Sequence, residues 1–251
     1  MKIAVVTSEV TFVKENYNQF LEALFNDSKD LEFELVVLQN NQFSHIIKGL
    51  GLILIGAHYT GFNLIKNSIR AHFKDHEKIA SKYSIRTHYF NSANHPDFYS
   101  FIKDNAIDLI VNARTRDIYK NKILKAPRLG CINIHHGILP VFRGTMCDLY
   151  ALFEGRPAGF SIHQMESKID NGAILKTIAV TDAHSQEPLN FPVHIFNSSK
   201  IEGKEMSLLL KTIKESQKLP IEKDNFSSQF IYTKNPHFSL IRQMKQKGMV
   251  L

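Results

Sequence analysis

The chain has 251 residues, with 31 Lys and Arg against 24 Asp and Glu, which gives a formal net charge of +7. Its 43% hydrophobic and 22% charged residues exclude a disordered or collagen-like chain, and only two cysteines, Cys131 and Cys147, exclude a disulfide scaffold and favour a cytoplasmic protein. The longest apolar stretch, Gly49 to Ala57, is much shorter than the ~20 residues of a transmembrane helix, and the first residues do not follow the pattern of a signal peptide.

The first half of the chain alternates strand-like and helix-like segments. Lys2 to Thr7 is a continuous apolar, β-branched run, typical of a strand buried on both faces of a parallel sheet, and Leu31 to Leu38 is the next strand. Between them, Phe12 to Phe25 has helical spacing with apolar side chains on one side. Further strands are expected at residues 84–90, 107–113 and 130–136. This alternation predicts an α/β fold, a Rossmann-like and mostly parallel twisted sheet with helices on both faces.

Residues 61–83 are predicted to form one long helix with an apolar stripe and a cationic stripe. Together with the apolar run from Leu50 to Ile55, the two stripes are compatible with docking on a membrane surface or a partner. A solvated face on a packed surface helix is the favoured interpretation. The apolar stripe consists of Phe62, Ile65, Ile69 and Phe73, and the cationic stripe of Lys66, Arg70, Lys74 and Lys78.

The last third of the chain does not continue the alternation of strands and helices. Two paired strands are expected at residues 158–165 and 173–180, followed by a polar connector after Val180 and a helix at 200–214. Pro236 is expected in the first turn of a short basic helix. We therefore expect one α/β domain over residues 1–181 and a helical C-terminal extension over 182–251 that packs on the same domain.

Two polar side chains share one face of the strand predicted at Cys131 to His136. Because side chains alternate along a strand, Asn133 and His135 point to the same side, close to the strand's C-terminal end. Neighbouring polar groups on one face of a core strand need hydrogen-bond partners when they are buried. The pattern fits either a functional site or a satisfied structural pair.

A second polar segment follows at residues 159–172. Alternation places His163 on the same face as Ser161, and Asp170 begins an Asp-Asn-Gly turn signature. By itself, such an aspartate is usually a turn former. It gains a chemical role only if the fold brings it to a histidine.

Together these segments resemble the catalytic core of the 10-formyltetrahydrofolate-dependent formyltransferases. The likeness is strongest over residues 107–180, and it implies transfer of a formyl group from 10-formyltetrahydrofolate to a primary amine. It also implies that Asn133 and His135 stabilise the tetrahedral oxyanion and that Asp170 assists proton removal. The ordered elements are Asn133-Ile134-His135, Leu139-Pro140, Arg143-Gly144, His163 and Asp170-Asn171-Gly172.

The resemblance further implies a binding site for the formyl donor beside two loops. The family usually has apolar residues in the first loop, whereas this chain has Arg114 and Arg116 there, so we expect backbone contacts more than side-chain contacts. No metal is expected, because His135 and His136 point to opposite faces of a strand and no thiol or carboxylate spacing completes a site with His163. The residues expected beside the donor are Arg116, Asp117, Ile118, Leu139, His163, Ser167 and Lys168.

The acceptor is expected to be a small, anionic amine such as a nucleotide-linked amino sugar. Residues 7–11 contain no glycine-rich phosphate loop of the kind that glycinamide ribonucleotide formyltransferases carry, and the ~70 residues after Val180 do not read as the barrel domain of methionyl-tRNA formyltransferases. No arginine-rich arm or zinc finger points to nucleic acid. A formyltetrahydrofolate hydrolase and a non-catalytic folate-binding relative are the alternatives, and a homodimer is left open.

Overall fold

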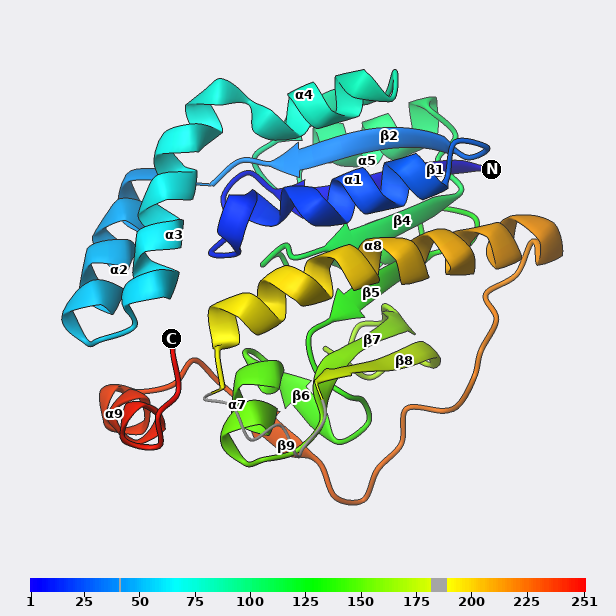
Figure 1. The fold of residues 1–251 in the computed structure, drawn as a ribbon. Helices are drawn as coiled ribbons and strands as arrows, with labels where there is room; N and C mark the ends of the chain where they lie inside the picture. The colour runs from blue at the N-terminus through cyan, green and yellow to red at the C-terminus, as the bar shows by residue number, and fades with distance from the viewer. Residues whose placement is uncertain (41, 182–188) are drawn as a thin grey trace.

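The computed structural model describes residues 1–40, 42–181 and 189–251 of the chain. Its centre is a seven-stranded sheet in the order β3-β2-β1-β4-β5-β7-β8 (Figure 1). The first five of these strands run parallel, β7 pairs antiparallel with β5, and β8 pairs antiparallel with β7. This confirms the predicted Rossmann-like sheet. The strands are β1 (Lys2–Ser8), β2 (Glu32–Leu38), β3 (Arg86–Phe90), β4 (Leu109–Ala113), β5 (Cys131–His135), β7 (Ala158–Gln164) and β8 (Ile174–Thr181).

The central strands are apolar on both faces because each face carries its own core. In β1, Ile3 and Val5 belong to one hydrophobic cluster, and Ala4 and Val6 to the other. The first cluster is covered by α1 (Asn18–Asp27) and α8 (Phe191–Ser216), and the second by α5 (Pro96–Asp104) and α6 (Asn121–Leu124). The helices therefore lie on both sides of the sheet, as expected.

The single helix predicted at residues 61–83 is wrong. The structure has α3 (His58–Arg70), a 3-10 turn (Ala71–Phe73) and α4 (Asp75–Lys82), separated at Lys74, which has a left-handed φ of 51°. The predicted apolar stripe is not the packed face of α3, because Gly61, Leu64 and Ser68 are buried instead. Phe62, Ile69 and Phe73 are exposed.

The helix predicted from Phe12 begins later than expected. Residues Lys14–Tyr17 form a 3-10 turn with left-handed φ values, and α1 starts at Asn18. The side chain of Asn16 holds this turn, because its Oδ1 accepts from the N–H of Thr11 and its Nδ2 donates to the carbonyl of Glu9, both at 2.7 Å. The predicted apolar side of the helix is buried as expected.

In the C-terminal part, helix α8 packs against α1 and against strands β7 and β8. The helix expected at 200–214 is longer, because Asn190 caps its start by accepting from the N–H of Val193 at 3.0 Å. Pro236 does not lie in the first turn of the basic helix but precedes its N-cap. The polar connector expected after Val180 falls largely on residues 182–188, which lie outside the described residues. The domain division at residue 181 stays a prediction. The remaining elements are α2 (Gln42–Leu54), β6 (Phe142–Gly144), α7 (Cys147–Phe153), β9 (Ile231–Thr233) and α9 (Phe238–Gln246).

Candidate active site

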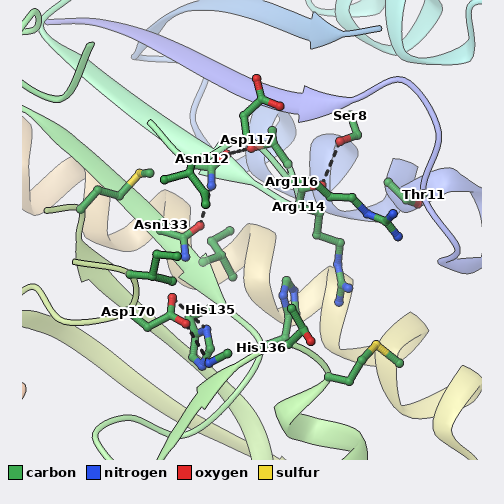
Figure 2. Close-up of a pocket in the computed structure, with 18 of the residues that line it drawn as sticks. Ser8, Thr11, Asn112, Arg114, Arg116, Asp117, Asn133, His135, His136 and Asp170 are labelled. Atoms are coloured by element: carbon green, nitrogen blue, oxygen red, sulfur yellow. Dashed lines mark hydrogen bonds and ion pairs between the residues drawn. The ribbon is translucent and has the colours of Figure 1, made fainter. Parts of the chain in front are cut away.

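A pocket of about 490 Å³ opens where β1, β4 and β5 reach their carboxyl ends (Figure 2). This is the edge at which open parallel sheets bind their ligands. Its wall contains the three predicted catalytic residues and five of the seven expected beside the formyl donor. Leu139 is instead buried in the turn after β5, and Ser167 is exposed outside the pocket wall. The predicted residues in the wall are Asn133, His135, Asp170, Arg116, Asp117, Ile118, His163 and Lys168.

A chain of hydrogen bonds fixes the carboxamide of Asn133 in one orientation. Its Oδ1 accepts from Nδ2 of Asn112 at 2.8 Å, and its Nδ2 donates to Nε2 of His163 at 3.1 Å. The Nδ1–H of His163 donates to the carbonyl of Gln164 at 2.8 Å, so Nε2 is the acceptor nitrogen. Burial and the charge of His135 lower the pKa of His163 to about 4, which keeps this ring neutral. No acceptor in the described part of the chain takes the second N–H of Asn133, so it can serve a ligand.

Both ring nitrogens of His135 face hydrogen-bond acceptors. Its Nε2 lies 2.9 Å from the carbonyl oxygen of Phe142, and its Nδ1 lies 3.4 Å from Oδ1 of Asp170. Because a carbonyl and an ionised carboxylate can only accept, this geometry favours the doubly protonated imidazolium. Burial lowers the pKa of His135, but the hydrogen bond and charge of Asp170, together with those of Cys147, outweigh burial and raise this pKa well above its usual range. The two residues form a buried ion pair, the His135–Asp170 pair.

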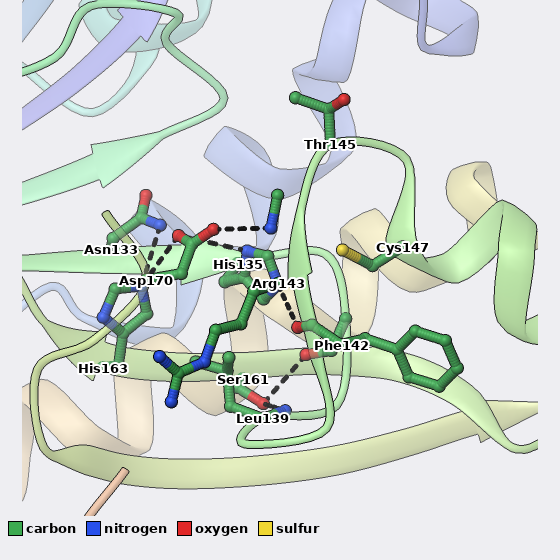
Figure 3. Close-up of polar contacts among 12 residues, drawn as sticks. Asn133, His135, Leu139, Phe142, Arg143, Thr145, Cys147, Ser161, His163 and Asp170 are labelled. Atoms are coloured by element: carbon green, nitrogen blue, oxygen red, sulfur yellow. Dashed lines mark hydrogen bonds and ion pairs between the residues drawn. The ribbon is translucent and has the colours of Figure 1, made fainter. Parts of the chain in front are cut away.

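The carboxylate of Asp170 is held in place from two sides (Figure 3). Burial raises the pKa of Asp170, but its hydrogen bonds with His135 and with the N–H of Gly144, which lies 2.9 Å from Oδ2, lower it to about 2. The turn that contains Asp170 is tied down by Asn225, whose Nδ2 donates to the carbonyls of Asp170 and Gly172 at 3.0 Å each. Asp170 is therefore ionised and rigidly placed at neutral pH.

Asn225 was not predicted, because it lies 55 residues after Asp170 in a segment without a regular pattern. Arg143 links the same elements, because its guanidinium donates to Oδ1 of Asn171 and to the carbonyl of Asn225, both at 2.9 Å. The Arg-Gly element of the predicted motif thus supports the turn of Asp170 rather than touching the pocket with its arginine.

A second group of buried charges, which the sequence analysis missed, lies next to the pocket and ties α8 to the end of β5. The carboxylate of Glu202 accepts from the hydroxyl of Tyr17, from Ser198 at 2.7 Å and from His136 at 3.2 Å. Burial raises the pKa of Glu202, but His136 and Arg114 outweigh it and lower this pKa to about 2. The Arg114 guanidinium lies 3.8 Å from Glu202 and stacks on the Tyr17 ring, 4.9 Å from its centroid.

Asp148 is a further carboxyl group in the pocket wall that the sequence analysis missed. It is the second residue of α7, and its Oδ1 accepts from the N–H of Leu149 at 2.9 Å. Burial raises the pKa of Asp148 to about 7, although the charge of Arg114 opposes this shift. The wall therefore combines one carboxylate that stays ionised with one that titrates near neutrality.

Replacing Gly144 with Ala is expected to weaken both the fold and the site. Gly144 has a φ of +98°, and a Cβ there would lie 2.2 Å from the carbonyl oxygen of Thr233 on β9. The strained, displaced backbone would cost about 2 kcal/mol of unfolding free energy and withdraw the N–H that Asp170 accepts. Chemical denaturation and steady-state kinetics should show this loss, with kcat/KM reduced about tenfold or more.

Gly155→Ala is the matched control for this substitution. Gly155 also has a positive φ, +68°, but a Cβ there would meet no atom of the described residues within 4 Å. The unfolding free energy of this variant should fall by only about 1 kcal/mol, because alanine is strained in the left-handed conformation, and its kinetic constants should not change. If both variants lost the same stability and activity, the contact between Gly144 and Asp170 would have no functional role.

Comparison with known proteins places this site in a family. The profile of the family described as formyl transferase matches residues 64–200, which include every element of the predicted motif. A methionyl-tRNA formyltransferase of Enterococcus faecalis is 40% identical over 111 residues, which cover 44% of this chain and 34% of that protein. A GDP-perosamine N-formyltransferase of Brucella melitensis is 30% identical over 120 residues, which cover 46% of each chain. The match thus spans less than half the length of these relatives.

Solved structures share the fold. A sugar N-formyltransferase from Shewanella sp FDAARGOS_354 superposes with a TM-score of 0.56 at 17% identity, covering 93% of this chain and 76% of that one. A phosphoribosylglycinamide formyltransferase from Anaplasma phagocytophilum superposes with a TM-score of 0.55 at 18% identity, covering 93% and 99%. At these identities the likeness shows a common α/β architecture.

Proposed function

The chain belongs to the formyl transferase family, and we propose that it transfers a formyl group from 10-formyltetrahydrofolate to the primary amine of a small anionic acceptor. The observation that supports this most strongly is the convergence of Asn133, His135 and Asp170 in one pocket wall, although Asp170 is 35 residues away from His135 in the sequence. An amide donor and an imidazolium can stabilise the oxyanion of formyl transfer to an amine, and a carboxylate can accept a hydrogen bond from the amine.

The amide of Asn133 and the charge of His135 would stabilise the oxyanion. When an amine attacks a formyl carbon, negative charge develops on its oxygen, and a fixed N–H donor with a nearby cation favours that state. Asn133 meets this need because its carboxamide is already oriented by Asn112 and His163. The imidazolium of His135 adds positive charge without having to acquire a proton during the reaction.

Asp170 would receive the attacking amine. Its ionised carboxylate can accept an N–H of the amine and orient the nitrogen lone pair towards the formyl carbon. A carboxylate with a pKa of about 2 holds a proton weakly, so the amine proton passes on to the departing folate nitrogen. Overall, a bond forms between the amine nitrogen and the formyl carbon, and the bond between that carbon and the folate nitrogen breaks. One proton moves from the amine nitrogen to the folate nitrogen.

The loop after β4 is suited to the formyl donor through its backbone. Arg116, Asp117 and Ile118 all line the pocket. The side chain of Asp117 is already engaged, because its Oδ2 accepts from Ser92 Oγ at 2.7 Å and from the N–H of Ala93 at 2.6 Å. Asp117 would therefore hold the loop in shape, while Ile118 and Lys168 contribute to the pocket wall.

Arg114 supports an anionic acceptor. Its side chain is only 8% exposed, yet it lines the pocket. Within the described residues its Nε and Nη2 have no hydrogen-bond partner, although Nη2 lies 3.8 Å from a carboxylate oxygen of Glu202. A buried guanidinium with unsatisfied donors favours a carboxylate or phosphate nearby. A nucleotide-linked amino sugar offers such a group, and the relative from Brucella melitensis is named for one, GDP-perosamine.

Arg114→Gln is expected to raise KM for an anionic amine acceptor about tenfold or more, with a smaller effect on kcat. The substitution removes a charge that would bind the acceptor in the ground and transition states alike. Steady-state kinetics with varied acceptor would measure the split, and Arg242→Gln, at an exposed position of α9, is the control. An unchanged KM would remove Arg114 from acceptor binding.

The experiment that tests the proposed function mixes the protein with 10-formyltetrahydrofolate and a panel of aminated nucleotide sugars. Release of tetrahydrofolate that depends on one of these amines is the expected result. Release without any added amine would instead favour a formyltetrahydrofolate hydrolase. Failure to bind the donor at all would favour a non-catalytic relative and contradict the proposal.

A further inference from the structure

Helix α2 exposes apolar side chains along one face. Phe43, Ile47, Leu50 and Leu54 follow one another at intervals of four, three and four residues, so they share one side of the helix. Phe43 is 72% exposed and Leu54 is 87% exposed. Side chains of this size are rarely left in water in such a row on a soluble protein unless they have an interaction to make.

Helix α3 and the 3-10 turn after it repeat the pattern. Tyr59, Phe62, Ile69 and Phe73 are all more than half exposed and also share one side. Lys66 is exposed at the position between Phe62 and Ile69, in the middle of this side. We call these residues and those of α2 together the α2–α3 face.

The two helices present the α2–α3 face on the same side of the hairpin. They pack on each other so closely at two glycines that a Cβ on Gly61 would lie 2.5 Å from the carbonyl oxygen of Gly49. The inner sides, with Leu52 and Leu64, pack on Val10 next to the sheet. Since each helix meets its partner on its flank and the sheet on its inner side, the exposed residues of both point away from the body. Figure 1 shows the hairpin projecting from one end of the sheet.

The charge of this hairpin has one sign. Residues 42–74 contain four Lys or Arg and no Asp or Glu. Arg70 pairs with Asp75 at 2.7 Å and Lys74 with Glu77 at 3.2 Å, both from α4. Within the described part of the chain, Lys48 and Lys66 make no ion pair, so a positive charge remains beside and inside the apolar face.

We propose that the α2–α3 face docks this protein on an anionic lipid surface. Aromatic and aliphatic side chains would enter the boundary between headgroups and acyl chains, and Lys48 and Lys66 would meet lipid phosphates. Among the described residues, no helix meets the length and hydropathy needed to span a bilayer. The proposal does not depend on formyl transfer.

The positive charge of the α2–α3 face disfavours binding of a second copy of this chain to it. A two-fold contact through the α2–α3 face would bring the Lys48 and Lys66 side chains of both copies together, without a carboxylate from either hairpin to neutralise them. Anionic lipids supply that negative charge. The pocket stays open in such a complex, because the hairpin residues in its wall, His45 and Leu64, belong to the inner side.

The test is flotation of the full chain with two kinds of vesicle, pure phosphatidylcholine and phosphatidylcholine mixed with phosphatidylglycerol. We expect binding to the mixed vesicles that weakens with salt, and little binding to the neutral ones. Leu50→Asp and Lys66→Glu should each reduce binding to the mixed vesicles by about tenfold or more.

Two variants on α8 are matched controls. Leu208→Asp changes a leucine that is 55% exposed, against 53% for Leu50, and Lys204→Glu reverses a charge at another exposed helix position. Both should bind vesicles like the unchanged protein, and circular dichroism should show all four variants folded.

The proposal would be overturned by absence of binding to mixed vesicles or by an equal loss of binding in the α8 variants. It would also be overturned by loss of binding in Lys66→Glu without loss in Leu50→Asp. So would a dimer in light scattering that Leu50→Asp converts to a monomer.

Discussion

Replacing Asp170 with Asn should lower kcat by about a thousandfold while leaving the affinity for the formyl donor nearly unchanged. The amide can still accept the N–H of Gly144, but it no longer holds the proton on His135 or receives the attacking amine. The loss therefore falls on the chemical step. Single-turnover measurement of tetrahydrofolate release, with donor affinity from equilibrium binding, separates the two quantities.

The same variant should also shift the pH dependence. In the unchanged protein, Asp170 helps to raise the pKa of His135 well above its usual range, so loss of the imidazolium proton lowers activity only on the alkaline side. Without that carboxylate, only Cys147 still opposes the effect of burial, so the pKa of His135 falls and the alkaline decline moves to lower pH. Asp224→Asn, at an exposed position, is the control. An unchanged rate and pH profile in Asp170→Asn would remove Asp170 from the mechanism.

Asn133→Ala should reduce kcat by about a hundredfold to a thousandfold, which is the usual effect of losing one oxyanion donor. The change removes the free N–H and also leaves Nδ2 of Asn112 and Nε2 of His163 without their partner. Stability should fall as well, because buried polar groups lose hydrogen bonds. A kcat within threefold of the unchanged protein would show that the oxyanion is stabilised elsewhere.

Part of this site was accessible from the sequence because strand alternation is a strong constraint. Alternation placed Asn133 and His135 on one face. In the structure, β7 sets His163 directly opposite Asn133. The position of Asp170 depends on the turn between β7 and β8, which local pattern does not determine. The contact between Asp170 and His135 was predicted only from the resemblance of the ordered motif to a family.

The supporting residues could not be predicted, because their partners are distant in the sequence. Glu202 lies 66 residues after His136 and looks like any glutamate of an amphipathic helix, yet it is completely buried. Asn225 likewise has no local signal. Such contacts arise from tertiary packing, which periodicity does not describe.

The exposed face of α3 shows a different limit. Periodicity correctly grouped Phe62, Ile69 and Phe73 on one side, but it does not tell which side packs. The buried side of α3 is partly polar, because Nδ2 of Asn67 donates to the carbonyls of Thr11 and Val13 at 2.9 and 2.7 Å. These hydrogen bonds fix the helix with its apolar stripe outwards.

The most direct measurement follows a carbon-labelled formyl group from 10-formyltetrahydrofolate by mass spectrometry in a single turnover. If Asn133 and the His135–Asp170 pair act together at the reacting carbon, the label appears on the amine nitrogen of a nucleotide-linked amino sugar, with one tetrahydrofolate formed for each label moved. The Asp170→Asn protein should bind the donor and leave the label on it. Label recovered as formate, or label transfer at the same rate in both proteins, would contradict this account.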